Sequence, residues 1–153
     1  DKSLESFLYI DLIIKIFPNA KFVYCKRNNI ANLLAILKVF LPNLLWSHSI
    51  ENIISIINLY NNKLNQIVSN KKIQFKIIEL EKFSENPKVY SKDLFEFLGL
   101  EWSQQILDPS LKTEYKIKTI SNIQVRNKIS KHELSYLDNY IPLLRKYRID
   151  NLI

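Results

Sequence analysis

The chain has 153 residues and a formal net charge of +7 at pH 7, with 47% hydrophobic and 24% charged residues. This composition excludes a disordered chain, and the length suffices for one domain with a substantial core. A single cysteine excludes an internal disulfide and a cysteine-built metal site, and no apolar run is long enough to cross a membrane.

The first two predicted elements are a helix and a strand. Ser3 can cap a helix over residues 4–17, whose side chains are apolar on most sides, so we expect this helix to be largely buried. A turn at 18–19 then leads into a buried strand at about 21–25. Cys25 ends that strand with no apparent base beside it, which favours core packing over a nucleophile.

A basic corner follows this strand. The pattern at 30–40 predicts a helix with Asn28 or Asn29 as its N-cap, so Lys26 and Arg27 lie where a strand's carboxyl end meets a helix N-terminus. In open α/β sheets anions bind in that crevice, because free N–H groups and the helix dipole point there. A guanidinium can clamp a phosphate through two parallel hydrogen bonds. The alternative is a solvated charge pair at a strand end.

The middle of the chain predicts the fold class. Ser49 can cap a long helix, and a second apolar strand follows at about 73–80. Two apolar strands joined by about fifty mostly helical residues predict a parallel, right-handed βαβ unit and therefore an α/β fold. Asn86 and Pro87 then open a helix that ends at Gly99, the only glycine of the chain.

The remaining chain predicts a short helix at 102–107, an irregular basic segment at 108–127 and a last helix ending near Tyr147. Ser130 and Glu133 have the spacing of a capping box for that last helix.

The usual catalytic motifs are absent from the sequence. His48 and His132 lack zinc-ligand spacing, so we interpret them as a loop histidine and a capping-turn histidine and expect no metal. One glycine, at a helix end, cannot form a glycine-rich phosphate loop. The aromatic residues fall at helix-core spacing and no recognition motif is present, so we expect no nucleic-acid partner despite the basic charge.

The order and spacing of several stretches match one known family. They read Asp1-Lys2, Phe17-Pro18-Asn19-Ala20-Lys21-Phe22, Cys25-Lys26-Arg27, Glu81 with Asn86-Pro87, Phe97-Leu98-Gly99-Leu100-x-Trp102, and Thr119-x-Ser121-x-x-Gln124-Val125-Arg126. Together they resemble the PAPS-dependent sulfotransferase family. The most similar branch contains the bacterial sulfotransferases with tetratricopeptide repeats and the tyrosylprotein sulfotransferases.

This resemblance implies a P-loop-like α/β sulfotransferase fold and transfer of a sulfuryl group from PAPS, the donor, to a hydroxyl of a protein tyrosine or carbohydrate. It implies that Arg27, with Lys26, binds the donor's 3′-phosphate and that Lys2 lies beside the sulfuryl group as a catalytic residue. It also implies that a donor-closing loop contains Ser121, Arg126 and Lys128.

Departures from the family pattern leave a second function open. Ala35 stands where the family has a serine, eight residues after the arginine. We expect residues 1–153 to be a single partial domain that is inactive alone. The resemblance implies that its first strand, phosphosulfate loop and catalytic base lie upstream, after a fused repeat domain. The alternative is a catalytically inactive sulfotransferase-like module that binds a polyanion or a protein partner. With no visible signal peptide, we expect a cytoplasmic protein.

Overall fold

The computed structural model describes residues 5–39, 41–70, 73–108 and 129–152 of the chain. Its sheet has two strands, β1 (Lys21–Lys26) and β2 (Gln74–Glu79), which pair in parallel. The register places Lys21 opposite Gln74 and Lys26 opposite Glu79, so both strands end at the same edge of the sheet. The predicted parallel βαβ arrangement and the α/β class are confirmed.

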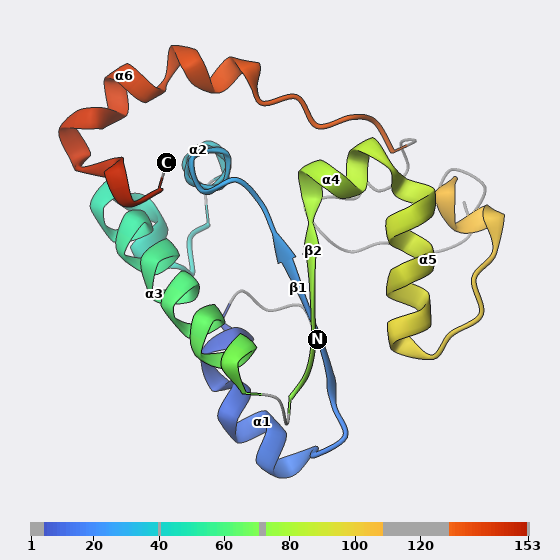
Figure 1. Cartoon of the computed structure of the whole chain (residues 1–153). Helices are drawn as coiled ribbons and strands as arrows, with labels where there is room; N and C mark the ends of the chain where they lie inside the picture. Colours follow the sequence, from blue (N-terminus) through green and yellow to red (C-terminus); the bar gives the residue numbers. More distant parts are fainter. Residues whose placement is uncertain (1–4, 40, 71–72, 109–128, 153) are drawn as a thin grey trace.

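The crossover between the strands consists of α2 (Asn29–Lys38) and α3 (Ile50–Ser69), joined by a short 3₁₀ helix at Leu45–His48. Ser49 caps α3 as predicted, because its hydroxyl accepts a hydrogen bond from the backbone N–H of Asn52 at 3.4 Å. Figure 1 shows the C-terminal segment arching over α2 to reach α3. These three parts enclose the main core, formed by Ile30, Ala31, Leu33, Leu34, Ile53, Ile54, Ile57, Leu137, Leu144, Ile149 and Leu152.

Aromatic side chains fill the space between the sheet, α3 and the start of the chain. The ring centroid of Phe7 lies 5.1 Å from that of Tyr24 on β1 and 5.7 Å from that of Tyr60 on α3. Tyr24 also stacks on Phe75 of β2 at 6.4 Å. Burial in this cluster raises the pKa values of both tyrosines above the usual phenol range.

The first helix is less buried than the sequence predicted. A 3₁₀ turn at Ser6–Tyr9 precedes α1 (Ile10–Ile16), and Ile10 is its only buried residue among those described. Leu12 and Phe17 are 55% and 62% exposed, because the described structure covers α1 on one side only. The prediction of a largely buried helix was therefore wrong.

Cys25 is also exposed, which corrects the prediction that it packs in the core. In β1 only Phe22 and Tyr24 are half-buried, whereas Val23 and Cys25 are exposed. Since side chains alternate between the faces of a strand, Val23 and Cys25 share the face opposite Tyr24. Helix α5 (Pro87–Leu98) lies against β2 on the sheet and leaves this part of β1 uncovered.

After β2 the structure contains one helix that was not predicted, followed by the predicted helix that ends at Gly99. The strand ends at Glu79, and an unpredicted helix α4 (Leu80–Glu85) begins at once. Helix α5 has Pro87 in its first turn and ends at Gly99, which has the left-handed backbone angle φ of 74°. The N–H of Leu100 donates to the carbonyl of Phe95 at 2.9 Å, which completes the helix end. The short helix predicted next is a 3₁₀ turn at Gln104–Leu107.

Gly99→Ala should lower the free energy of unfolding by about 1 kcal/mol, because a residue with a Cβ is disfavoured in the left-handed conformation. The added Cβ would lie 3.6 Å from Nζ of Lys21, an ordinary contact, so the cost comes from the backbone rather than a clash. Urea denaturation measures the difference, with the exposed Glu101→Ala as control. Equal midpoints for both variants would show that the left-handed turn is not a stabilising requirement.

The predicted capping box at Ser130 and Glu133 is wrong. The last helical region starts later, as a 3₁₀ helix at Ser135–Asn139 followed by α6 (Ile141–Leu144) and 3₁₀ turns at Arg145–Tyr147 and Ile149–Leu152. Glu133 pairs with Lys131 at 3.3 Å instead of capping. The proline at position 142 lacks the N–H that a continuous helix would use.

Candidate anion site at the carboxyl end of β1

The basic corner has the predicted backbone geometry. Lys26 is the last residue of β1, Arg27 follows it, and α2 begins at Asn29. Asn28 is the N-cap, because its Oδ1 accepts a hydrogen bond from the N–H of Ala31 at 3.0 Å. The corner is therefore fixed at the point where strand and helix meet, and buried residues of α2 lie directly behind it.

A carboxylate from the neighbouring strand end holds this corner. Oε1 of Glu81, in the first turn of α4, accepts a hydrogen bond from the backbone N–H of Asn28 at 2.9 Å. A negative charge at this place opposes the attraction that a helix N-terminus alone would exert on an anion. Positive charge for an anion must therefore come from side chains, and Arg27 is the one placed at the corner.

The guanidinium of Arg27 is only partly satisfied. Its Nη2 lies 3.1 Å from Nε2 of His132. Its Nε is buried and has no hydrogen-bond partner among the described residues. An arginine offers five N–H donors and no acceptor, and a buried unpaired donor costs about 1–3 kcal/mol. The described residues therefore leave part of the hydrogen-bonding capacity of this guanidinium unused.

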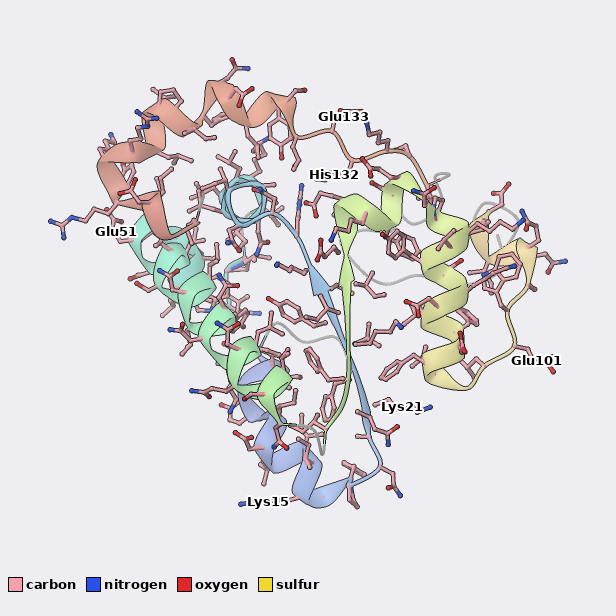
Figure 2. The ribbon with its side chains drawn as sticks, viewed as in Figure 1. Lys15, Lys21, Glu51, Glu101, His132 and Glu133 are labelled. Atoms are coloured by element: carbon pink, nitrogen blue, oxygen red, sulfur yellow. The ribbon has the colours of Figure 1, made fainter. Side chains whose placement is uncertain are left out.

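His132 reaches Arg27 because the segment before the C-terminal helices is held against α4 (Figure 2). The backbone N–H of His132 donates to Oγ of Ser84 at 2.9 Å. The hydroxyl of Ser84 in turn donates to the carbonyl of Glu81 at 2.8 Å. Three segments far apart in the sequence thus meet at the corner.

Sequence reasoning missed the parts played by Ser84 and His132. His132 was interpreted as a capping-turn histidine, and its contact with Arg27 joins residues 105 positions apart. The sequence identifies Glu81 only as part of the family pattern. In the sequence, Ser84 and His132 belong to no motif that would indicate a contact with a distant residue. Their residue types alone therefore could not reveal these hydrogen bonds. His48 is exposed as predicted, but it ends the 3₁₀ helix at Leu45–His48 instead of lying in a loop, with Nε2 at 3.1 Å from the carbonyl oxygen of Leu41.

The charges next to Arg27 are partly neutralised. Lys26 is exposed and lies opposite Glu79 in the sheet register. Glu79 pairs with Lys82 at 2.9 Å. The hydrogen bond from Lys82, with a smaller contribution from the charge of Lys26, lowers the pKa of the Glu79 carboxyl, and the same pair raises the pKa of Lys82. Lys26 thus has an acidic neighbour in Glu79.

Of the predicted site residues, the described part of the chain contains two, the sequence neighbours Lys26 and Arg27. Lys2, Ser121, Arg126 and Lys128 lie outside the described residues. Ala35 is half-buried on α2 and offers no hydroxyl where the family pattern has one. Over the described part of the chain, no group of three or more histidine, cysteine, aspartate or glutamate residues could hold a metal ion.

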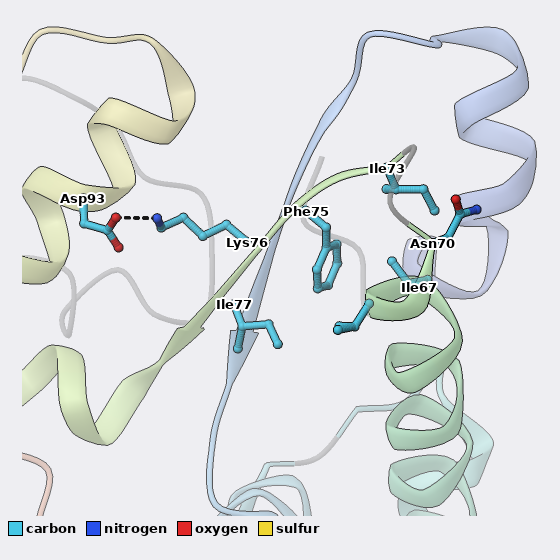
Figure 3. A pocket seen from close by; sticks show the side chains of 8 residues that line it. Ile67, Asn70, Ile73, Phe75, Lys76, Ile77 and Asp93 are labelled. Atoms are coloured by element: carbon cyan, nitrogen blue, oxygen red, sulfur yellow. Dashed lines mark hydrogen bonds and ion pairs between the residues drawn. The ribbon is translucent and has the colours of Figure 1, made fainter.

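An open hollow of about 400 Å³ lies elsewhere, beside the start of β2 (Figure 3). Apolar side chains of the α3 end and of β2 line it, and the ion pair between Lys76 and Asp93, at 2.6 Å, borders it. Because Arg27 follows the opposite, carboxyl end of the paired strands, this hollow is separate from the basic corner.

The fold and the corner define an α/β protein with an arginine at a strand-to-helix turn. A comparison with known families matches residues 1–104 to the Sulfotransferase family. The chain belongs to this family. It is also 29% identical over 136 residues to an uncharacterized protein of Aquifex aeolicus (strain VF5), an alignment that covers 84% of the chain and 17% of that relative. The chain thus spans less than a fifth of the relative's length. None of the described helices combines the length and apolar character of a membrane span.

Proposed function

We propose that Arg27 binds the 3′-phosphate of PAPS in a P-loop-like sulfotransferase that moves a sulfuryl group to a hydroxyl of a protein tyrosine or a carbohydrate. One observation carries the proposal: a half-buried guanidinium lies at the carboxyl end of β1 with its Nε unpaired among the described residues. Family membership supports the class of reaction. The matched sequence stretches support the branch with tetratricopeptide-linked and tyrosylprotein sulfotransferases.

The chemistry assigns Arg27 a binding task. In sulfuryl transfer the donor supplies the sulfuryl group, whose bond to a phosphate oxygen breaks as the acceptor oxygen bonds to sulfur and gives its proton to a base. Such in-line transfers depend mostly on positioning and on cations near the leaving phosphate. Arg27 would fix the far end of the donor through two parallel hydrogen bonds. We assign Lys2 to the leaving phosphate, and Lys26, Ser121, Arg126 and Lys128 to donor binding.

A second function is supported by Ala35. A hydroxyl lost from a phosphate site costs about 1–3 kcal/mol, which weakens donor binding without abolishing it. A catalytically inactive relative that binds a polyanion or protein partner through the same corner would tolerate that loss.

Calorimetry of the full-length protein with adenosine 3′,5′-bisphosphate tests the proposal. Adenosine 5′-monophosphate, which lacks only the 3′-phosphate, is the matched control ligand. We expect the bisphosphate to bind at least about tenfold more tightly, because Arg27 has charge-assisted hydrogen bonds to offer that phosphate. Equal affinity for the two ligands, or binding of neither, would contradict the proposal. Turnover of PAPS with a tyrosine peptide or a glycan then separates the enzyme from the inactive module.

A further inference from the structure

We propose that His132 is the positioning residue of Arg27: its imidazole accepts a hydrogen bond from the guanidinium and holds it ready for a phosphate. The inference rests on the proposed phosphate-binding function of Arg27 and adds to it a second residue from a distant part of the chain. Its basis is the contact of Arg27 Nη2 with His132 Nε2 at 3.1 Å, together with the hydrogen bonds that anchor each of the two residues.

The direction of the hydrogen bond follows from the chemistry of the two groups. Arginine remains protonated and has only donors, so Nε2 of His132 must be the acceptor. An imidazole that accepts at Nε2 is neutral and carries its proton on Nδ1. The structure therefore assigns one tautomer to His132 in the absence of a phosphate.

His132 is itself held in place by its backbone. Its N–H bonds Oγ of Ser84, Ser84 bonds the carbonyl of Glu81, and Glu81 accepts from the N–H of Asn28 next to Arg27. These hydrogen bonds, with the Arg27–His132 contact, form a closed ring that joins the β1–α2 corner, α4 and the segment before the C-terminal helices. The imidazole cannot leave the guanidinium by a simple shift of its backbone without breaking this ring.

Other charges near His132 are engaged elsewhere. Lys131 pairs with Glu133 at 3.3 Å and approaches Glu85 at 4.0 Å, and all three side chains are more than half exposed. Glu81 uses Oε1 for the corner backbone. Among these described neighbours, Arg27 is the charged side chain that contacts the imidazole.

Positioning strengthens binding because an arginine side chain loses conformational entropy when it binds a ligand. A side chain that is already fixed loses less. The side chain has about 2 kcal/mol of rotamer entropy, and a partner that fixes it beforehand removes part of this cost. The single acceptor of His132 occupies one N–H of Nη2 and leaves the other N–H groups of the guanidinium without a partner from this imidazole. The opposite possibility is that His132 blocks the site by competing with phosphate for Nη2. The two possibilities predict opposite changes in affinity when the acceptor is removed.

Two substitutions at one position separate these possibilities in the full-length protein. His132→Leu removes the acceptor and keeps the bulk, whereas His132→Gln restores an acceptor at a similar distance from the backbone. We expect His132→Leu to weaken adenosine 3′,5′-bisphosphate binding by about 5- to 20-fold, and His132→Gln to return the affinity to within about twofold of wild type. If His132 had a structural role only, the His132→Gln variant would not regain the bisphosphate affinity of the wild type. His48→Leu, at the exposed histidine that ends the 3₁₀ helix at Leu45–His48, should leave the bisphosphate affinity unchanged.

An Arg27→Ala background completes the cycle. If His132 acts through Arg27, His132→Leu should have no further effect once Arg27 is absent. Unchanged or tighter binding by His132→Leu in the wild-type background would overturn the positioning inference while leaving the phosphate site intact. If Arg27→Ala itself has no effect, both the proposed function and this inference fail.

Nitrogen NMR of the unliganded wild-type protein gives a readout that does not depend on how the variants fold. We expect the His132 imidazole to carry its proton on Nδ1 and none on Nε2. A proton on Nε2, in either the other tautomer or the cation, would overturn the inference.

Discussion

Arg27→Ala should weaken the binding of adenosine 3′,5′-bisphosphate by about 100-fold in the full-length protein. Each hydrogen bond to a charged group contributes about 1.5–3 kcal/mol, and a tenfold change in affinity corresponds to about 1.4 kcal/mol. Loss of two such hydrogen bonds therefore accounts for a decrease in affinity of at least about 100-fold. Calorimetry at one fixed salt concentration measures the change, because the electrostatic part of the affinity varies with salt.

Two further variants identify the cause of that loss. Arg145→Ala removes the same charge from an exposed arginine after α6 and should change the affinity by less than about twofold. Arg27→Lys keeps the charge but loses the planar fork, so an intermediate loss of about tenfold is expected. If Arg27→Ala and Arg145→Ala behave alike, Arg27 is a solvated charge at a strand end and the phosphate site is refuted.

The elements that local patterns determine were predictable from the sequence. Ser49 and Asn28 cap helices because their side chains bond backbone N–H groups within three residues, and Gly99 ends a helix because of its own backbone freedom. The parallel pairing of the two strands followed from the long helical crossover between them. Each of these features depends on a short stretch of chain or on the order of such stretches.

Burial was less predictable, because it depends on what covers a surface rather than on the surface itself. The apolar pattern of α1 correctly indicated a helix, yet Leu12 and Phe17 are exposed in the described structure. The same holds for Val23 and Cys25, whose strand has an apolar sequence on both faces. Sequence patterns show which side chains favour burial, but not whether a neighbouring layer is present.

The partner of Arg27 could not be found from local patterns either. The spacing of Ser130 and Glu133 favoured a capping box, and His132 was assigned to that turn. In the structure the His132 N–H bonds Ser84 instead, and this tertiary hydrogen bond prevails over the local cap. The position of Arg27 was predictable, since the corner is local, whereas its contact with His132 depends on how the C-terminal third folds back.

The core behind the corner leads to the second large prediction. Leu33→Ala should lower the free energy of unfolding by about 2–5 kcal/mol, because the side chain is completely buried and its removal leaves a cavity that can collapse only partly. Leu33 lies on α2, between α3 and the C-terminal segment, where no solvent reaches it. Urea denaturation of the full-length protein, monitored through a signal from this domain, measures the decrease in the free energy of unfolding.

Leu45→Ala is the matched control, since it deletes the same atoms from a leucine that is 79% exposed, and it should cost less than about 0.5 kcal/mol. A difference below about 1 kcal/mol between the two variants would show that α2 is not held by this core.

The Leu33→Ala substitution should also affect ligand binding at the Arg27 corner. Asn28 and Arg27 are attached to the first turn of α2, so an α2 that opens more often presents the guanidinium in its bound geometry less often. Bisphosphate affinity should therefore fall in Leu33→Ala only near its unfolding midpoint, whereas in Arg27→Ala it falls under fully native conditions.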